Sequence, residues 1–273
     1  MTETPALPHF RRAPVTEFAI SIQFEALDKF NFAHIGPLHQ SFASEFPGIE
    51  FHPPIPPMIE VFGPVTPTIN LPFLLPWASI GQIPRMWMLD DKNEKLIQFQ
   101  QDRFVINWRK TKENMEYPRY PGLRDEFFVD LEKLRAFLSE RELGEIIPVQ
   151  CELTYVNQVP APEGVAELSA RAFANWRELR PTRLGSPEDV AINQRFVIRG
   201  DDGGPIGRIY FQSAPSAQPV ETRSVQLMMI GRAAPSSRSL NAARERLDSM
   251  HELIVLSFVE LMSKEIQQEW EPA

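Results

Sequence analysis

The chain has 273 residues, of which 43% are hydrophobic, and a net charge of −8 at neutral pH. This composition is sufficient for a large buried core. An acidic chain is a poor general ligand for phosphate backbones, which disfavours nucleic acid as a partner. A lone cysteine, Cys151, excludes an intrachain disulfide and a thiolate zinc cluster and fits a reducing compartment. The opening residues lack an apolar signal segment and the apolar runs are too short to span a bilayer, so we expect a cytoplasmic protein without a membrane segment.

Residues 13–27, APVTEFAISIQFEAL, alternate between apolar and polar side chains. Side chains of a strand alternate between the two faces of a sheet, so this pattern predicts a strand with one apolar and one polar face. The polar face would carry Glu17, Ser21, Gln23 and Glu25. A helix is expected within residues 31–46, where apolar residues recur at helical spacing.

Proline is unusually frequent, and ten of the 26 prolines lie between Pro47 and Pro84. This segment cannot form a helix and can hold only a short strand, best placed at residues 58–65. The simpler interpretation is an ordered connector wrapped over the body of the protein. The alternative is a lid or a partner-binding arm, and the apolar residues at 71–77 favour docking over disorder.

The remaining elements are predicted from hydrophobic periodicity and turn residues. Three strands that form a meander are expected first, followed by one helix. A further strand, a helix, three strands and a long C-terminal helix come next. In chain order these elements are residues 85–89, 95–100, 103–109, 124–141, 146–159, 165–179, 190–199, 206–213, 224–231 and 239–268, and residues 200–205, GDDGGP, form a hairpin turn.

Each half of the chain therefore reads as a strand, a helix, three or four strands and a helix. The halves are residues 1–145, which include the proline-rich arm at 47–84, and residues 146–273. We predict an α+β fold in which the two halves share one curved antiparallel sheet with helices on one face. This plan suggests an internal duplication in the order of elements.

The polar face of such a sheet gathers arginine, tyrosine and amide side chains, which suit an acidic or peptide-like partner. An ordinary solvated face is the competing interpretation. We single out as ligand- or partner-binding candidates Glu17, Gln23, Arg103, Trp108, Arg109, Tyr117, Arg195, Arg208, Tyr210 and His251.

The sequence contains no G-x-S-x-G, G-x-G-x-x-G or P-loop motif, so we assign no catalytic residue and no cofactor. The run HELIV at 251–255 begins like a zinc-binding H-E-x-x-H motif, but Val255 replaces the second histidine, and we assign no metal site. His251 is expected to be a structural residue, with a hydrogen bond to Glu17 or Glu25 as the functional alternative.

These observations favour a non-catalytic binding or interaction protein that uses the polar sheet face. The alternative is an enzyme or a small-ligand carrier with a pocket between sheet and helices, where Glu17 or His251 could act as an acid or base. The C-terminal helix is apolar over most of its circumference, so the 71–77 arm or a second subunit should cover it, and we expect a homodimer.

Several segments together resemble a sporadically distributed bacterial family of uncharacterised proteins of similar length. They are the opening APVTEFAISIQF, the central NWRK with EYPRYPG, and the ending LDSMHELIVLSFVELM. The resemblance implies a bacterial cytoplasmic protein and supplies neither an activity nor catalytic residues. The positions that match the family pattern are Pro14, Glu17, Trp108, Tyr117, Pro118, His251, Glu252 and Phe258.

Overall fold

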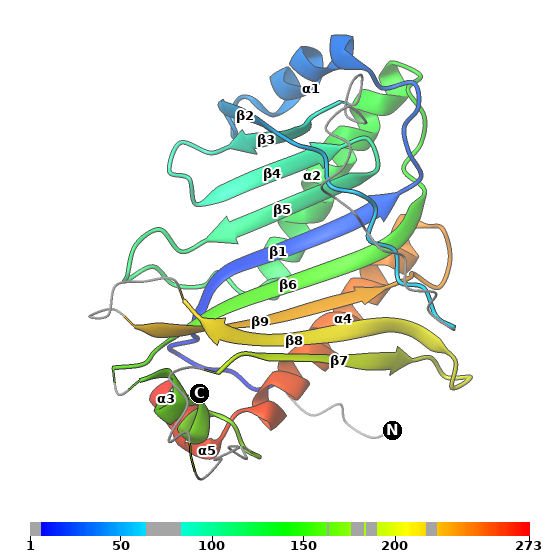
Figure 1. Ribbon diagram of the computed structural model, residues 1–273. Coiled ribbons are helices and arrows are strands. Elements are labelled where there is room, and N and C mark those ends of the chain that lie inside the picture. Colours follow the sequence, from blue (N-terminus) through cyan, green and yellow to red (C-terminus); the bar gives the residue numbers. More distant parts are fainter. Residues whose placement is uncertain (1–6, 64–82, 163, 176–182, 184–189, 217–222) are drawn as a thin grey trace.

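A computed structural model describes residues 7–63, 83–162, 164–175, 183, 190–216 and 223–273. The predicted α+β fold is confirmed, because the described strands form one antiparallel, curved and open sheet (Figure 1). Its nine strands lie in the order β2-β3-β4-β5-β1-β6-β9-β8-β7.

The first half of the chain supplies one end of the sheet. Alternating apolar residues form its strands, and Asn31 caps the short helix η1 by accepting a hydrogen bond from the amide of Ala33 at 3.0 Å. The elements are β1 (Val15–Phe24), η1 (Phe32–His34), α1 (Ile35–Phe42), β2 (Gly48–His52), β3 (Arg85–Leu89), β4 (Lys95–Gln100), β5 (Arg103–Arg109) and α2 (Tyr120–Glu140).

The described elements of the second half repeat this order with one strand fewer in the meander. The Asp-Gly hairpin turn at 200–205 joins two of its strands, as the sequence predicts. The elements are β6 (Pro148–Pro160), α3 (Val165–Ala172), β7 (Ile192–Arg199), β8 (Pro205–Pro215), β9 (Ser224–Ala233), α4 (Leu240–Leu261) and α5 (Lys264–Glu269).

The two halves meet at the centre of the sheet, where β1 and β6 pair along almost their whole length. Ile20 lies opposite Leu153, and Ile22 lies opposite Cys151. From this seam each meander continues outward, the first through β5 to β2 and the second through β9 to β7. The halves therefore share one hydrogen-bonded sheet.

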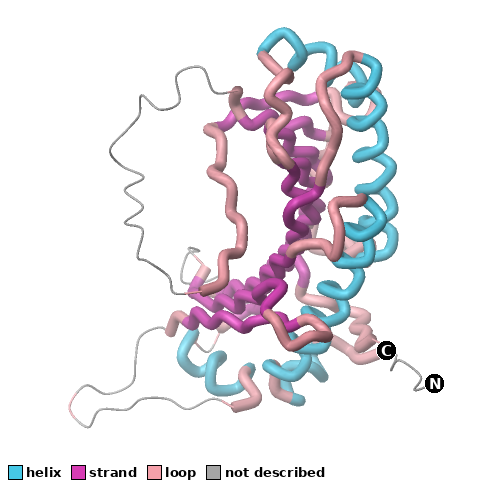
Figure 2. The backbone as a smooth tube through the Cα atoms, turned by 90° about the vertical axis from the view of Figure 1, so that its right-hand side faces the viewer, coloured by secondary structure: helices cyan, strands magenta, loops and turns pink. Residues whose placement is uncertain are grey.

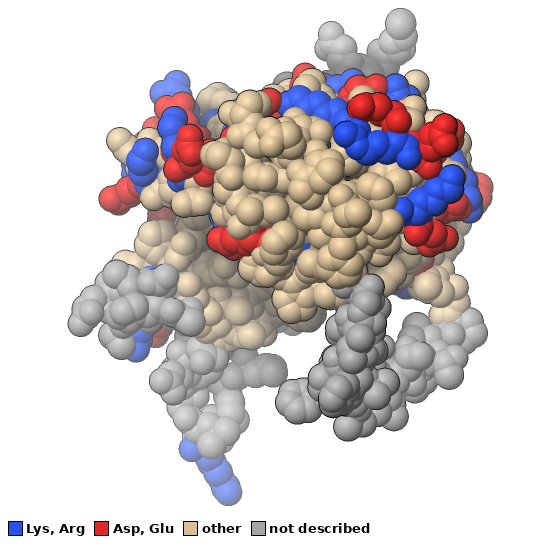
Figure 3. Space-filling view, turned by 90° about the horizontal axis from the view of Figure 1, so that it is seen from above, with Lys and Arg blue, Asp and Glu red and all other residues tan. Residues whose placement is uncertain are grey.

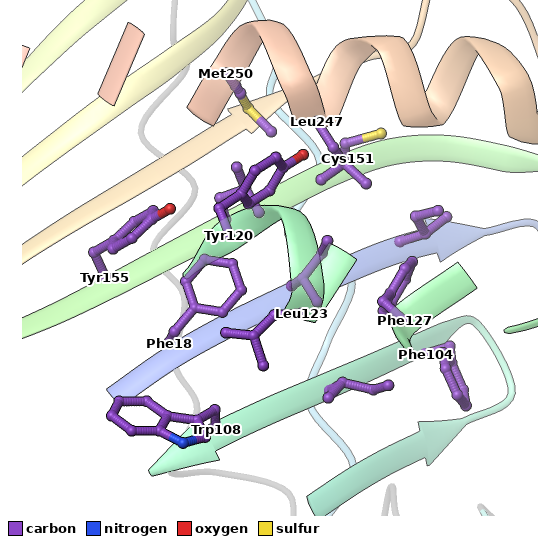
Figure 4. Packing of buried hydrophobic residues seen from close by; sticks show 14 of the residues in the cluster. Phe18, Phe104, Trp108, Tyr120, Leu123, Phe127, Cys151, Tyr155, Leu247 and Met250 are labelled. Atoms are coloured by element: carbon purple, nitrogen blue, oxygen red, sulfur yellow. The ribbon is translucent and has the colours of Figure 1, made fainter. Parts of the chain in front are cut away.

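Helices α1, α2 and α4 cover one face of the sheet, whereas α3 and α5 lie together beyond its lower end (Figures 1 and 2). The core fills the space between the sheet and these three helices (Figure 4). Phe18, Phe104 and Phe127 are at most 1% exposed there. Each such side chain contributes about 1.5–3 kcal/mol by leaving water, so this layer fixes which sheet face is apolar.

The structure corrects three of the expected boundaries. Residues 58–63 are extended but pair with no described strand, and the short strand of this region is β2 instead; residues 64–65 lie outside the described residues. Helix α2 begins four residues earlier than predicted, because Pro121 fits the first turn of a helix. Helix α3 ends at Ala172, since Phe173 becomes extended and pairs with Met262.

The predicted C-terminal helix is in fact two helices. Met262 is extended, with ψ 140°, which ends α4. The Ser263 side chain then accepts a hydrogen bond from the amide of Ile266 at 3.2 Å and caps a new helix, α5. A serine inside an apolar run is thus a cap, which hydrophobic periodicity alone does not reveal.

The described residues cover the apolar circumference of α4 only in part, since Leu247 and Ile254 are buried whereas Val255, Leu256 and Val259 are half-buried. Phe258 stacks on Trp270, whose ring also contacts Phe10. Leu253 is 37% exposed, so only part of the helix faces solvent. The 71–77 arm lies outside the described residues, and the homodimer stays a prediction. No helix in the described part of the chain has the length and apolarity needed to cross a membrane.

Charged residues of both signs are mixed on the surface. Seen from the α1 end, Lys and Arg alternate with Asp and Glu around a broad uncharged area (Figure 3).

Candidate functional site

An extended segment crosses the sheet face that the helices leave uncovered. Residues 53–63, here called the strap, follow β2 and pass in front of β5, β1 and β6 (Figures 1 and 2). Pro53, Pro54, Pro56 and Pro57 keep the strap extended and remove four amide donors, so it cannot join the sheet as a strand. Its backbone must therefore find partners other than a strand ladder.

Three glutamines on three strands supply those partners. Gln100 of β4 accepts from the amide of Ile55 and donates to its carbonyl oxygen, both at 2.8 Å. Gln23 of β1 accepts from the amide of Met58 at 3.0 Å. The third residue, Gln150 of β6, accepts from the amide of Glu60 at 2.7 Å and donates to the carbonyl oxygen of Met58.

This arrangement recognises the backbone of the strap rather than its side chains. A carboxamide carries the same donor and acceptor as a peptide group, so each glutamine replaces a neighbouring strand. The three residues are between 2% and 8% exposed, so the bonds are shielded from water. Leaving such a buried amide unpaired would cost about 1–3 kcal/mol, which makes an extended peptide the natural occupant of this face.

Arg103 supports the central glutamine. Its guanidinium donates to Gln23 Oε1 at 3.0 Å and to the carbonyl oxygen of Pro56 at 3.2 Å. Burial lowers the pKa of Arg103, while the carboxylate of Asp102, 3.9 Å from Arg103 Nε, acts in the opposite direction. A buried cation is thus held against the strap by carbonyl-type oxygens, and the carboxylates of Asp102 and Glu152 favour its charged form.

The end of the strap is held by a charged side chain. The Glu60 carboxylate accepts from the Tyr210 hydroxyl at 2.7 Å and forms an ion pair with Arg208. Arg208 also donates to the carbonyl oxygen of Val61 at 3.0 Å, and its guanidinium lies over the ring of Phe62 at 4.3 Å. Burial and the adjacent Glu60 carboxylate raise the pKa of Tyr210, so its hydroxyl remains a donor. This contact is selective for an acidic side chain.

Three other predicted candidates share the same sheet face but not the strap. Glu17 accepts from Asn107 at 2.8 Å and lies 3.6 Å from Arg109. The Arg109 guanidinium is 5.2 Å from the ring centre of Trp87. Arg195 is exposed on the edge strand β7, opposite Tyr210 in the register. The Glu17 carboxylate therefore binds Asn107 and Arg109 on the side of the sheet opposite the helices.

The last three candidates, Trp108, Tyr117 and His251, lie on the helix-covered side. Trp108 is 1% exposed and contacts the Tyr117 ring in the core, 5.4 Å away. His251 is half-buried, and the alternative of a hydrogen bond to Glu17 or Glu25 is not found. Instead, His251 Nδ1 lies 2.7 Å from the Tyr155 hydroxyl, because β6 and α4 meet on this side of the sheet.

The protonation of His251 follows from its neighbours. The Tyr155 side chain is buried, and its hydroxyl has two polar neighbours, His251 Nδ1 at 2.7 Å and the Tyr117 hydroxyl. One hydrogen is shared between the Tyr155 oxygen and Nδ1, and we assign the arrangement in which Tyr155 donates, which leaves the imidazole hydrogen on Nε2. Burial lowers the pKa of His251 to about 4, which keeps the imidazole neutral near pH 7. The ring also stacks on Tyr120, with ring centres 4.0 Å apart.

Of the ten predicted candidates, the structure brings four together at the strap: Gln23, Arg103, Arg208 and Tyr210. Sequence analysis missed Gln100, Gln150 and the partner residue Glu60. A signal for the two glutamines was present, since both lie at polar positions of strands that alternate between apolar and polar residues. Their alignment with Gln23 depends on the strand register, which the sequence does not provide.

Comparison with known proteins adds no assignment to this geometry. No family model matches the chain, and no curated protein matches it at a significant level. The resemblance to a sporadic bacterial family therefore stays a prediction.

Proposed function

We propose that this is a non-catalytic binding protein whose uncovered sheet face holds an extended, proline-rich peptide segment with an acidic side chain. The observation that carries the proposal is the row of three glutamines, each of which bonds to the peptide backbone of the strap. In this proposal the strap occupies the site in the same way as the peptide partner would.

The contacts at Glu60 support the choice of an acidic segment. Arg208 and Tyr210 both meet the carboxylate, and Arg208 also binds the following carbonyl oxygen. Backbone bonds provide affinity for any extended peptide, and this charged contact provides selectivity. Prolines reduce the conformational entropy that a peptide loses on binding.

A tethered strap would compete strongly with a partner. Segments joined by short connections reach effective concentrations of about a millimolar, so a free peptide must bind better or arrive when the strap is weakened. The test is therefore made on the full chain with E60A, which removes the carboxylate of the strap and leaves the sheet residues intact.

The probe is a fluorescein-labelled peptide of residues 52–62, HPPIPPMIEVF, followed by fluorescence anisotropy. We expect saturable binding to E60A at a Kd about 100-fold below that of the unaltered chain, because about 3 kcal/mol of competing interaction is lost. A peptide with glutamine in place of Glu60 should bind E60A about tenfold more weakly. That difference should disappear in the double variant E60A/R208A.

The matched control is E25A, which removes an exposed carboxylate paired with Arg238 outside the strap and should leave peptide binding as in the unaltered chain. Two results would overturn the proposal. One is the absence of saturable peptide binding to folded E60A. That result would make the strap a fixed structural element. The other is equal binding of the glutamate and glutamine peptides, which would refute the selectivity of the face for an acidic side chain.

A further inference from the structure

A second site lies on the helix side of the sheet, separate from the strap. A pocket of about 360 Å³ is lined by residues between 7 and 15, by residues between 117 and 121 around the start of α2, by the second half of α4, and by Tyr155, Asn157 and Met229 of β6 and β9. Its lining is mainly apolar and includes Phe10, Ala13, Tyr120, Val255 and Phe258. A cavity of about 150 Å³ accepts benzene, so this pocket is large enough for a molecule with two fused rings.

Two hydrogen-bond donors accompany the apolar lining. His251 lines the pocket, and its Nε2–H has no partner among the described residues and is not buried. Tyr117 also lines the pocket, and its hydroxyl is buried beside that of Tyr155 without a hydrogen bond of normal geometry. A donor that lines a pocket and has no acceptor within the described residues offers a position at which an acceptor of a ligand can bind.

The backbone at the edge of the pocket is strained. Arg119 has φ 70° and ψ 151°, a conformation that residues other than glycine rarely adopt. Its guanidinium donates to the carbonyl oxygen of Phe10 at 2.8 Å, which ties the N-terminal wall of the pocket to the start of α2. Strain of this type concentrates at ligand sites, where surrounding contacts maintain it.

We propose that this pocket binds a small, predominantly apolar molecule that carries one carbonyl oxygen, with the ring system between α4 and residues 7–15 and the oxygen accepting from His251 Nε2. The Tyr155 hydroxyl fixes the orientation and the tautomer of the imidazole, so Tyr155 is a positioning residue. A carbonyl oxygen is present in both ketones and carboxylates. Arg119 at the edge of the pocket would favour a carboxylate, and the experiment distinguishes the two.

The experiment uses the solvatochromic naphthyl ketone 6-propionyl-2-(dimethylamino)naphthalene with the full chain. We expect saturable binding with a blue-shifted emission. The substitution V255W fills the pocket with a larger side chain and should abolish that binding.

Displacement of the probe then tests the hydrogen bond. We expect 2-acetylnaphthalene to displace the probe at about one tenth of the concentration that 2-ethylnaphthalene requires, since only the ketone offers an acceptor. The double variant Y155F/H251F removes the imidazole without leaving an orphaned hydroxyl, and in it the two compounds should be equivalent. Displacement by 2-naphthoate at a still lower concentration would identify the ligand class as carboxylate rather than ketone.

Y210F serves as the matched control, because it removes a tyrosine hydroxyl from the opposite sheet face and should leave probe binding unchanged. Absence of saturable binding, or unchanged binding in folded V255W, would overturn the site. Equal displacement by the ketone and the hydrocarbon in the unaltered chain would overturn the role of His251. If V255W does not fold, the displacement series in the unaltered chain and in Y155F/H251F still tests the proposal.

Discussion

Replacing Glu60 by alanine should release the strap while leaving the sheet folded. The carboxylate of Glu60 receives the Tyr210 hydroxyl at 2.7 Å and the Arg208 guanidinium, and its side chain is only 7% exposed. Hydrogen bonds to a charged group contribute about 1.5–3 kcal/mol each. Some of this is regained when Arg208 returns to water, so we expect the strap to lose about 3 kcal/mol of local stability.

Native-state hydrogen exchange measures this loss directly. The amides of Ile55 and Met58 are bonded to Gln100 and Gln23, so they exchange only when the strap lifts from the sheet. In E60A their exchange should accelerate by about 100-fold, since every 1.4 kcal/mol corresponds to about a tenfold change. Amides at the β1–β6 seam, such as that of Ile20, should keep the protection that global unfolding sets.

The same experiment on E25A provides the control, because that carboxylate pairs with Arg238 at the surface and touches no strap residue. Unchanged exchange at Ile55 and Met58 in E60A would refute the reasoning. So would an equal acceleration at Ile20, because the strap would then unfold only together with the whole sheet.

Three further outcomes follow from the structure. The folded pKa of His251, about 4, lies below its ordinary value of 6.5, so this group stabilises the fold above pH 6.5 and loses that contribution as the pH falls through 4. Urea titrations should show the free energy of unfolding of the unaltered chain decreasing by about 3 kcal/mol more than that of Y155F/H251F over this range. The substitution Y117F removes a buried hydroxyl that has no hydrogen bond of normal geometry, so the free energy of unfolding in urea should stay unchanged or rise by about 1 kcal/mol. The substitution Y120F removes the hydrogen bond to Asp248, so the free energy of unfolding should fall by about 1 kcal/mol. S263A removes the cap of α5 and should cost about 1 kcal/mol, with a fall in Tm of about 2–4 °C by calorimetry, and S263D should restore most of it.

Strong periodicity made most of the fold predictable from the sequence. In β1 the alternation of Phe18, Ile20 and Ile22 with polar residues determined both the strand and its buried face. The repeated order of elements predicted the shared sheet. The first strand of each half, β1 and β6, pairs with the other at the centre of that sheet. Local pattern failed at Ser263, where a capping side chain divides one apolar run into two helices.

The candidate site was only partly predictable. Which residues face away from the helices follows from alternation, and Gln23, Arg103, Arg208 and Tyr210 were identified in this way. That the strap would lie on them depends on contacts between residues far apart in the chain, such as Glu60 with Arg208. His251 was expected to be a structural residue, and its partner Tyr155 could not be predicted, because the crossing of α4 over β6 is set by packing.

The seam between β1 and β6 also determines the order in which the chain can complete its fold. When synthesis has reached the end of α2, β1 is paired with β5 on one side only, and the partner for its other edge has not yet been made. An open edge of this kind pairs readily with other chains. A chain that stopped at this point would therefore present the middle of the final sheet as an exposed edge, and the arrival of β6 removes it.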